Sequence, residues 1–241
     1  HENDDFSMQM TARDVPRMRS VSRYAFFDMD HTLTSADTGL LFLRWWALRH
    51  PVSFWRLAGA PLVIAGWKLG LLPLRRVKEF CFSMLRGRRV DEVDRAAREF
   101  AGRYFPRLCK IPALELLRDL AGTHTLVLAS ASPEFYVRYF AERFGFEHFV
   151  ATRYEIRAGR YTGRMEGEDC RDGEKVRRIA AIVPLGGYDR DESVAFSDNV
   201  VADGPLLDLA GQQFRVHPKK WQFVPFSGIR PRADRRSLDF D

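Results

Sequence analysis

The feature that most constrains this chain is a short apolar run, Tyr24–Phe27, that ends at two carboxylates, Asp28 and Asp30. An uninterrupted apolar run of this kind predicts a short strand buried on both faces, as in parallel sheets. In open α/β sheets, ligands bind just beyond the carboxyl ends of the strands. Asp28 and Asp30 therefore lie where chemistry is expected, although aspartate is also common as an ordinary turn residue at such a point.

Composition restricts the class of protein without selecting a function. The chain has 241 residues, of which 46% are hydrophobic and 29% are charged, as in an ordinary globular protein with a substantial core. The net charge of +6 favours anionic partners in general, whether phosphorylated metabolites, nucleic acid or an anionic membrane surface. The basic residues show no interleaved aromatic platform and no base-reading motif, which argues against nucleic acid.

Cysteine usage and the N-terminal composition predict a cytoplasmic protein. Cys81, Cys109 and Cys170 are an odd number at unrelated spacings, so they predict neither a disulfide framework nor a zinc site. Residues 1–16 are polar and acidic, with no apolar core of a secretion signal. We therefore expect a reducing compartment, and the sequence leaves the oligomeric state open.

A long helical region follows the first strand and predicts an inserted subdomain. Helices are expected over residues 40–50, 51–71, 73–86 and 90–104. The segment 57–67 is apolar for eleven residues, about half of what a bilayer span needs. We expect it to pack within the subdomain, and we disfavour peripheral contact with a membrane surface. The aromatic residues of this region are likewise expected to form core and not a substrate cage: Trp45, Trp46, Phe54, Trp55 and Trp67.

After residue 112 the pattern changes to strands alternating with helices, which indicates a mainly parallel sheet covered on both faces. Strands are expected at 125–130, 149–152, 193–197 and 213–216, helices at 113–121, 173–183 and 205–210, and a hairpin at 154–164. Ser132-Pro133-Glu134 predicts the start of a further helix that ends at Gly145, with Ser132 as its N-cap.

These patterns predict four parts of the chain. We expect a flexible N-terminal arm (1–20), an α/β core domain (21–36 and 108–218), a helical cap (37–107) and a basic C-terminal tail (219–241).

Further polar residues follow the other predicted strands or open a helix. Ser130 ends one strand, Asp198 and Asp203 follow another, and Lys175 lies in the first turn of a helix. Taken singly, each has an ordinary explanation as a strand-end hydroxyl, a loop acid or a solvated lysine. Because the carboxyl ends of parallel strands meet at one edge of the sheet, together they predict a single site there.

In this order, the motifs resemble those of the haloacid dehalogenase superfamily and of its subfamily IB, which includes phosphoserine phosphatase. The resemblance covers Tyr24 to about Val216 and rests on Asp28-Met-Asp30-His-Thr32, Leu128-Ala-Ser130-Ala-Ser132, Gly173-Glu-Lys175 and Phe196-Ser-Asp198-Asn-Val-Val-Ala-Asp203-Gly-Pro205. It implies a Rossmann-like core with a mainly parallel sheet and an inserted α-helical cap.

The resemblance also implies a Mg²⁺-dependent phosphatase. Asp28 would be the nucleophile that forms an aspartyl-phosphate, and the side chain of Asp30 would be the general acid and base. Mg²⁺ would be bound by Asp28, Asp198 and the main-chain carbonyl of Asp30, with oxygen ligands of the kind that this ion prefers.

The remaining motif residues would act on the phosphoryl group or around the metal. Ser130 and Lys175 would hold the transferring oxygens, and Asp203 would support the metal site directly or through a neighbour. Four residues separate Asp198 from Asp203, where close relatives often have three. Asp37 corresponds to a glutamate that reads the substrate's amino group in phosphoserine phosphatases, but an N-cap of the following helix is an equally good interpretation.

The most favoured function is hydrolysis of a small phosphorylated metabolite. Alternatives are a membrane-surface-associated phosphatase of a lipid-derived phosphate, a phosphotransferase with the same residues, and a non-catalytic sensor of a phosphorylated ligand. Dehalogenation is disfavoured, because that reaction has no leaving alcohol for Asp30 to protonate.

Overall fold

A six-stranded sheet forms the centre of the computed structural model, which describes residues 22–51, 55–217 and 222–226. The strand order is β3-β2-β1-β6-β7-β8, and all neighbours are parallel except β7 and β8. The strands are β1 (Tyr24–Phe27), β2 (Thr125–Pro133), β3 (His148–Thr152), β6 (Val194–Ser197), β7 (Gln212–Val216) and β8 (Phe223–Pro225). The predicted arm at 1–20 lies outside the described residues.

β1 lies in the middle of the sheet because its residues are apolar on both faces. Ala25 and Phe27 belong to a core cluster on one face, and Tyr24 and Phe26 to a cluster on the other. The ring of Phe27 stacks on Phe196 of β6 with centroids 4.7 Å apart. The first predicted strand and the mainly parallel α/β sheet are therefore confirmed.

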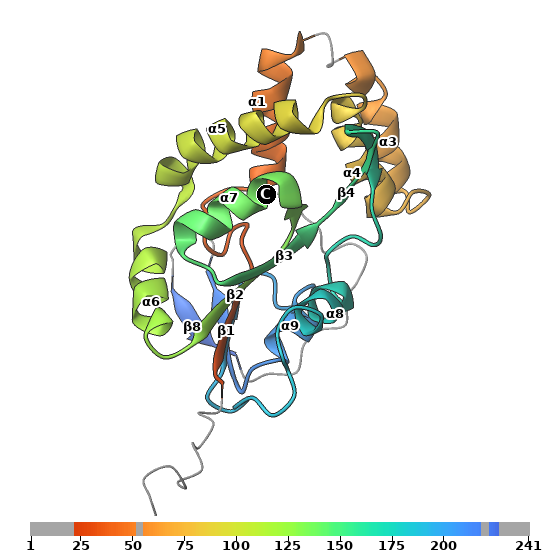
Figure 1. Cartoon of the computed structure of the whole chain (residues 1–241). Helices are drawn as coiled ribbons and strands as arrows, with labels where there is room; N and C mark the ends of the chain where they lie inside the picture. Colours follow the sequence, from red (N-terminus) through yellow and green to blue (C-terminus); the bar gives the residue numbers. More distant parts are fainter. Residues whose placement is uncertain (1–21, 52–54, 218–221, 227–241) are drawn as a thin grey trace, which may run out of the picture.

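Helices cover both faces of this sheet (Figure 1). Residues of α6 (Ile111–Ala121) and α7 (Glu134–Phe144) belong to the first cluster, and residues of α8 (Gly173–Ala180) and α9 (Gly204–Leu207) to the second. α7 ends at Gly145, whose φ of +80° gives the left-handed backbone that closes many helices. The predicted end at Gly145 is confirmed.

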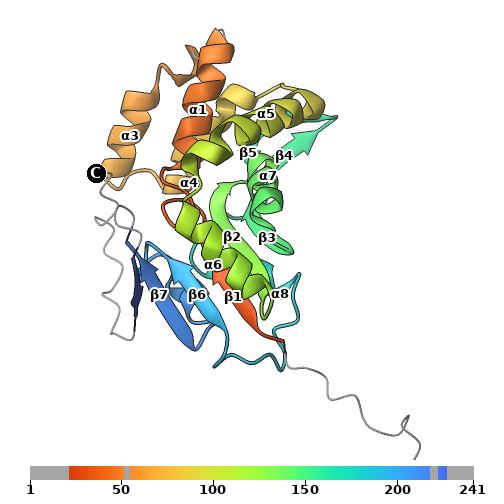
Figure 2. The same ribbon diagram turned by 90° about the vertical axis from the view of Figure 1, so that its left-hand side faces the viewer.

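The cap lies beyond one end of the sheet, as Figure 2 shows from the side. It contains α1 (Thr38–Arg49), the short helix η1 (Trp55–Leu57), α3 (Ala60–Lys68), α4 (Leu74–Phe82), the short helix η2 (Ser83–Leu85) and α5 (Val90–Leu108). Phe42 of α1 is the centre of its core, with ring centroids 5.2 Å from both Phe100 and Tyr136. None of the described helices is long and apolar enough to cross a bilayer.

A hairpin that the sequence places in the core domain pairs with the cap instead. β4 (Tyr154–Arg157) and β5 (Arg160–Met165) flank the predicted turn at Ala158-Gly159, where both residues have positive φ. The N–H of Gly87 donates to the carbonyl of Tyr161 at 2.8 Å, and the N–H of Val90 to that of Gly159 at 3.0 Å. The hairpin therefore adds to the cap, although it comes much later in the sequence than the cap helices.

Several local predictions differ from the structure. No residue of α3 is buried, so the expected packing of 57–67 into the cap core is wrong for this helix. Trp45 and Trp46 are buried as expected, but Trp55 is 68% exposed, Trp67 is half-buried, and Phe54 lies outside the described residues.

Two further differences concern the ends of elements. α7 begins at Glu134, with Pro133 and not Ser132 at its cap and no side-chain cap bond. Ser132 is needed elsewhere, as described below. Part of the predicted tail forms β8, which pairs with β7, and α5 continues to Leu108 with Pro106 inside it. Residues 218–221 and 227–241 lie outside the described residues.

Candidate active site

The carboxylate of Asp28 marks the carboxyl end of the central strand. Its N–H continues the ladder with β6 by donating to the carbonyl of Phe196 at 3.1 Å, so the backbone is fixed where the strand ends. The residue is buried. A buried carboxylate needs a cation and hydrogen-bond donors, and two neighbouring loops supply them.

Lys175 supplies the cation. Its ammonium lies 2.7 Å from Asp28 Oδ1 and 2.6 Å from Asp203 Oδ1, and the residue is 2% exposed. Burial alone lowers the pKa of Lys175, but the charges of Asp203 and Asp28 raise it above its usual value, so the ammonium stays charged. The interpretation of Lys175 as a solvated surface lysine is therefore wrong. Lys175 lies in the first turn of α8, and its side chain reaches Asp28 at the end of β1.

Asp203 bonds to Lys175 and to the last residue of β6. Oδ1 accepts the lysine bond, and Oδ2 accepts a 2.6 Å bond from the hydroxyl of Ser197, the last residue of β6. Both oxygens are thus engaged within the protein. This arrangement favours an indirect role for Asp203 over direct metal binding.

Asp198 lies on the other side of Asp28, and Thr32 joins the two. Thr32 Oγ1 lies 3.3 Å from Asp28 Oδ2 and 3.2 Å from Asp198 Oδ1, and it accepts a 2.9 Å bond from the N–H of Asp198. A tight turn after Asp28 brings Thr32 back beside it. In this turn His31 has φ +59°, and the N–H of Leu33 donates to the carbonyl of Met29 at 2.8 Å. One hydroxyl therefore spans the two carboxylates.

Asp30 points away from Lys175 and towards the cap. Oδ1 accepts the N–H of Thr38 at 2.9 Å and its hydroxyl at 2.7 Å, and Oδ2 accepts the hydroxyl of Ser132 at 2.5 Å. Burial, and then the charge of Asp37, raise the pKa of Asp30 to about 6, against the opposing bonds from Ser132 and Thr38. A carboxyl group with this pKa exchanges protons readily near neutral pH.

Ser130 and Asp37 occupy the edges of this arrangement. Ser130 is buried at the site end of β2, where its hydroxyl accepts the N–H of Ser132 at 3.1 Å. Asp37 is the N-cap of α1, because its carboxylate accepts the N–H of Leu40 at 2.9 Å. The structure thus supports the capping interpretation of Asp37, and contact with a substrate stays a prediction.

Sequence reasoning missed a lysine that reaches the site from the cap. Lys78 of α4 donates to the carbonyl of Ala131 at 3.0 Å and to both oxygens of Asp169 at 2.8 Å. Thr152 donates to the same carboxylate at 2.8 Å. The partners are 91 residues apart, so no local pattern could pair them.

The donor set fits Mg²⁺. Asp28 Oδ2 and Asp198 Oδ1 are hard oxygen donors that flank one hydroxyl, and Mg²⁺ takes one or two carboxylates and completes its shell with waters and substrate oxygens. Within the described residues, there is no group of three or more His, Cys, Asp or Glu side chains that could enclose a metal. An ion here would therefore depend on few protein ligands, as Mg²⁺ does.

The chain belongs to the haloacid dehalogenase-like hydrolase family. The model of that family matches residues 25–208, which include all the residues of the candidate site. Protein CicA of Caulobacter vibrioides is 31% identical over 192 residues, which cover 78% of this chain and 82% of that protein. Phosphoserine phosphatase SerB1 of Mycobacterium tuberculosis is 24% identical over 80% of this chain and 64% of its own length.

Solved structures share the fold. A protein of unknown function from Bordetella pertussis Tohama I has a TM-score of 0.66 at 27% identity, covering 83% of this chain and 92% of that one. A phosphoserine phosphatase solved as a phospho-aspartyl intermediate analogue has a TM-score of 0.55 at 19% identity, covering 80% of this chain and 85% of that one. The Rossmann-like core with a helical cap, expected from the motifs, is therefore confirmed.

Proposed function

We propose that this hydrolase is a Mg²⁺-dependent phosphomonoesterase that acts on a small phosphorylated metabolite through an aspartyl-phosphate at Asp28. The observation that carries the proposal is the placement of Asp28, which is buried at the end of the central strand, paired with Lys175 on one oxygen and facing Asp198 with the other. The phosphatase names of several relatives support the same class of reaction.

In the first step, a carboxylate oxygen of Asp28 attacks phosphorus and the bond to the leaving alcohol breaks. Splitting hydrolysis in this way replaces one difficult step with two easier ones. The leaving oxygen takes the proton of Asp30, whose orientation is fixed by Thr38 and Ser132. The products of this step are the free alcohol and the phosphorylated Asp28.

In the second step, Asp30 accepts a proton from water while the water oxygen attacks phosphorus. The bond to Asp28 breaks, which restores its carboxylate and releases inorganic phosphate. Asp30 thus acts first as an acid and then as a base, and a group with a pKa of about 6 suits both.

The remaining residues would stabilise charge on the transferring oxygens. The ammonium of Lys175 is held by Asp28, and the hydroxyl of Ser130 is held by the N–H of Ser132, so neither group would need to reorganise during the reaction. Mg²⁺ held by Asp28, Asp198 and the carbonyl of Asp30 would neutralise the phosphoryl group and the attacking carboxylate. Phosphotransfer to an alcohol would use the same residues.

The proposal is tested by hydrolysis of para-nitrophenyl phosphate with Mg²⁺ or with a chelator. We expect turnover that requires the metal and is abolished in Asp28→Asn. The matched control is Asp119→Asn on α6, an exposed aspartate outside the four motifs, which should keep wild-type activity. Wild-type turnover by Asp28→Asn would refute the nucleophile, and absence of all phosphatase activity over a broad panel would favour the sensor.

Asp30→Asn separates the two steps. With a good leaving group, the phosphorylated enzyme should still form slowly but should hydrolyse poorly, so acid-quenched samples should accumulate a phosphorylated protein. Equal loss of both steps would contradict the acid and base roles. A panel of phosphorylated amino acids, amino alcohols, sugars, nucleotides and lysolipids would then identify the substrate class.

A further inference from the structure

The helix α3 is apolar along its length but buries none of its nine residues. Leu62 is 79% exposed, and large apolar side chains before and after the helix are exposed in the same way. We call the exposed apolar residues of this segment the α3 surface: Trp55, Leu62, Ile64, Leu69 and Leu71. Single exposed apolar residues are ordinary, but a gathering of them marks an interaction site.

The side of α3 that faces the protein makes its contacts through glycines. A Cβ added to Gly59 would lie 3.4 Å from the ring of Phe80, and one added to Gly66 would lie 3.0 Å from Leu72 Cδ1. The N–H groups of Leu71 and Leu72 both bond to the carbonyl of Gly66, which folds the following chain back onto this side. The glycines thus fix which side faces the protein and leave the leucines outside.

The stretch of sequence that contains the α3 surface carries charge of one sign. Residues 38–78 contain no Asp or Glu and seven basic residues: Arg44, Arg49, Arg56, Lys68, Arg75, Arg76 and Lys78. Some of these pair with acids from other segments, as Arg49 does with Glu99. Among the described residues, no ion pair to an acid is found for Arg44, Arg56 or Lys68, and Arg44 and Lys68 are exposed.

We infer that the α3 surface docks on an anionic lipid bilayer. Exposed apolar side chains together with unneutralised Lys and Arg are what segments at a membrane interface combine, the former entering the acyl boundary and the latter facing lipid phosphates. Charge complementarity selects this occupant over a second copy of the chain, because a two-fold contact would place the same cations opposite one another. The inference concerns binding and does not rest on the proposed reaction.

Docking through α3 would involve the same part of the cap that contacts the candidate active site. α4 follows α3 directly and packs against it. Its Lys78 bonds to the carbonyl of Ala131, between Ser130 and Ser132. Docking would therefore place the bilayer next to the helix that contacts the site.

The test is co-sedimentation of the whole chain with phosphatidylcholine vesicles, with and without phosphatidylserine. We expect binding to the anionic vesicles at low ionic strength, weaker binding in salt, and none to phosphatidylcholine alone. Ile64→Asp should weaken binding by about tenfold or more, because a charge replaces an inserted side chain. Ile182→Asp is the matched control, since Ile64 is 42% and Ile182 41% exposed, and it should bind as wild type.

Charge is tested separately from apolar contact. Lys68→Glu should weaken binding by about tenfold, because it reverses one cation at the lipid surface. Arg118→Glu on α6, which is also exposed and has no ion pair to an acid among the described residues, should have little effect. All four variants change exposed residues, so circular dichroism and the melting temperature should match wild type.

Insertion itself has a fluorescence signature. Brominated phospholipid should quench part of the tryptophan emission of the wild type, and Trp55→Phe should reduce that quenching, because Trp55 is 68% exposed whereas Trp67 is half-buried and Trp45 and Trp46 are buried. No sedimentation with anionic vesicles at low ionic strength, or equal effects of Ile64→Asp and Ile182→Asp, would overturn the inference. Self-association that Ile64→Asp abolishes would overturn it too, and would assign the surface to contact between copies.

Discussion

The carboxyl edge of the sheet and the α3 surface depart from the usual distribution of residues in opposite ways. At the sheet edge, Asp28, Lys175 and Asp203 are buried although charged, and short ion pairs compensate them. On α3, Leu62 is exposed although apolar, and nothing compensates it within the described residues. The comparison teaches that the chain itself compensates the unusual residues of the first region, whereas for the second we infer a partner outside the chain.

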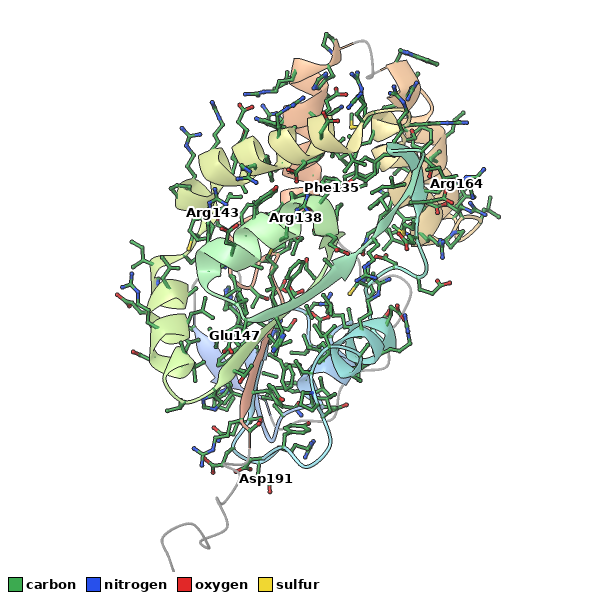
Figure 3. The ribbon with its side chains drawn as sticks, viewed as in Figure 1. Phe135, Arg138, Arg143, Glu147, Arg164 and Asp191 are labelled. Carbon is green, nitrogen blue, oxygen red and sulfur yellow. The ribbon has the colours of Figure 1, made fainter. Side chains whose placement is uncertain are left out.

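Figure 3 draws the side chains on the ribbon. Phe135, labelled there, lies at the start of α7, and its ring contacts Phe42 of the cap with centroids 5.2 Å apart. Packing of this kind ties the cap to the sheet through apolar contact. The exposed side of α3 is therefore not a consequence of a poorly packed cap.

The largest expected effect comes from removing the compensating charge at the sheet edge. Lys175→Met should lower kcat for para-nitrophenyl phosphate by about a thousandfold, because a preorganised charge in a closed site is lost and Asp28 and Asp203 then repel each other. Initial-rate kinetics measure it. Arg118→Met, on the exposed side of α6, is the control, and an effect below tenfold would return Lys175 to a minor role.

Truncating a leucine in each region should separate them by stability. Leu128→Ala, in β2 and fully buried, should lower the free energy of unfolding by about 2–5 kcal/mol. Leu62→Ala should change it by less than about 0.5 kcal/mol. Urea titration followed by circular dichroism measures both, and similar losses would mean that α3 packs against something in solution.

A smaller effect tests whether Ser132 belongs to the site or to a helix cap. Ser132→Ala should lower kcat by about tenfold, because Asp30 loses a charge-assisted hydrogen bond, with little change in unfolding free energy. Loss of stability by about 1 kcal/mol at unchanged kcat would instead restore the N-cap prediction. The two measurements together decide between the roles.

The smallest expected effect concerns Asp37. Asp37→Ala should lower the free energy of unfolding by about 0.5–2 kcal/mol, because α1 loses its N-cap. KM for the physiological substrate should stay within about twofold if capping is its whole role. A large rise in KM with an amine-bearing substrate would show that Asp37 also reads that group.

The sequence predicted those parts of the fold whose signal is local. β1 and β6 are apolar runs that end directly before Asp28 and Asp198, as predicted. β2 was also predicted, but it continues past Ser130 to Pro133. The prediction that Lys175 belongs to the site depended on the order of the motifs, because nothing in the sequence around a lysine at the start of a helix indicates that it is buried.

Other parts depended on partners distant in the chain. Ser132-Pro133-Glu134 has the composition of a helix start, but Asp30, 102 residues earlier, takes the serine hydroxyl. The apolar composition of 57–67 predicted burial. In the structure, α3 meets Phe80 and Leu72 at Gly59 and Gly66, and its larger apolar side chains are left exposed. β8 is three residues long and includes Pro225, so neither its length nor its composition indicated a strand.

The hydrogen bonds from Thr38, the first residue of α1, to Asp30 limit how the cap could be exchanged by protein engineering. Thr38 opens the cap, and its N–H and hydroxyl both end on the carboxylate of Asp30. A chimera that exchanges caps between relatives would also replace the residue that makes two hydrogen bonds to Asp30, unless the junction lies after Thr38. Under the proposed mechanism, an exchange of caps would therefore alter proton transfer by Asp30 as well.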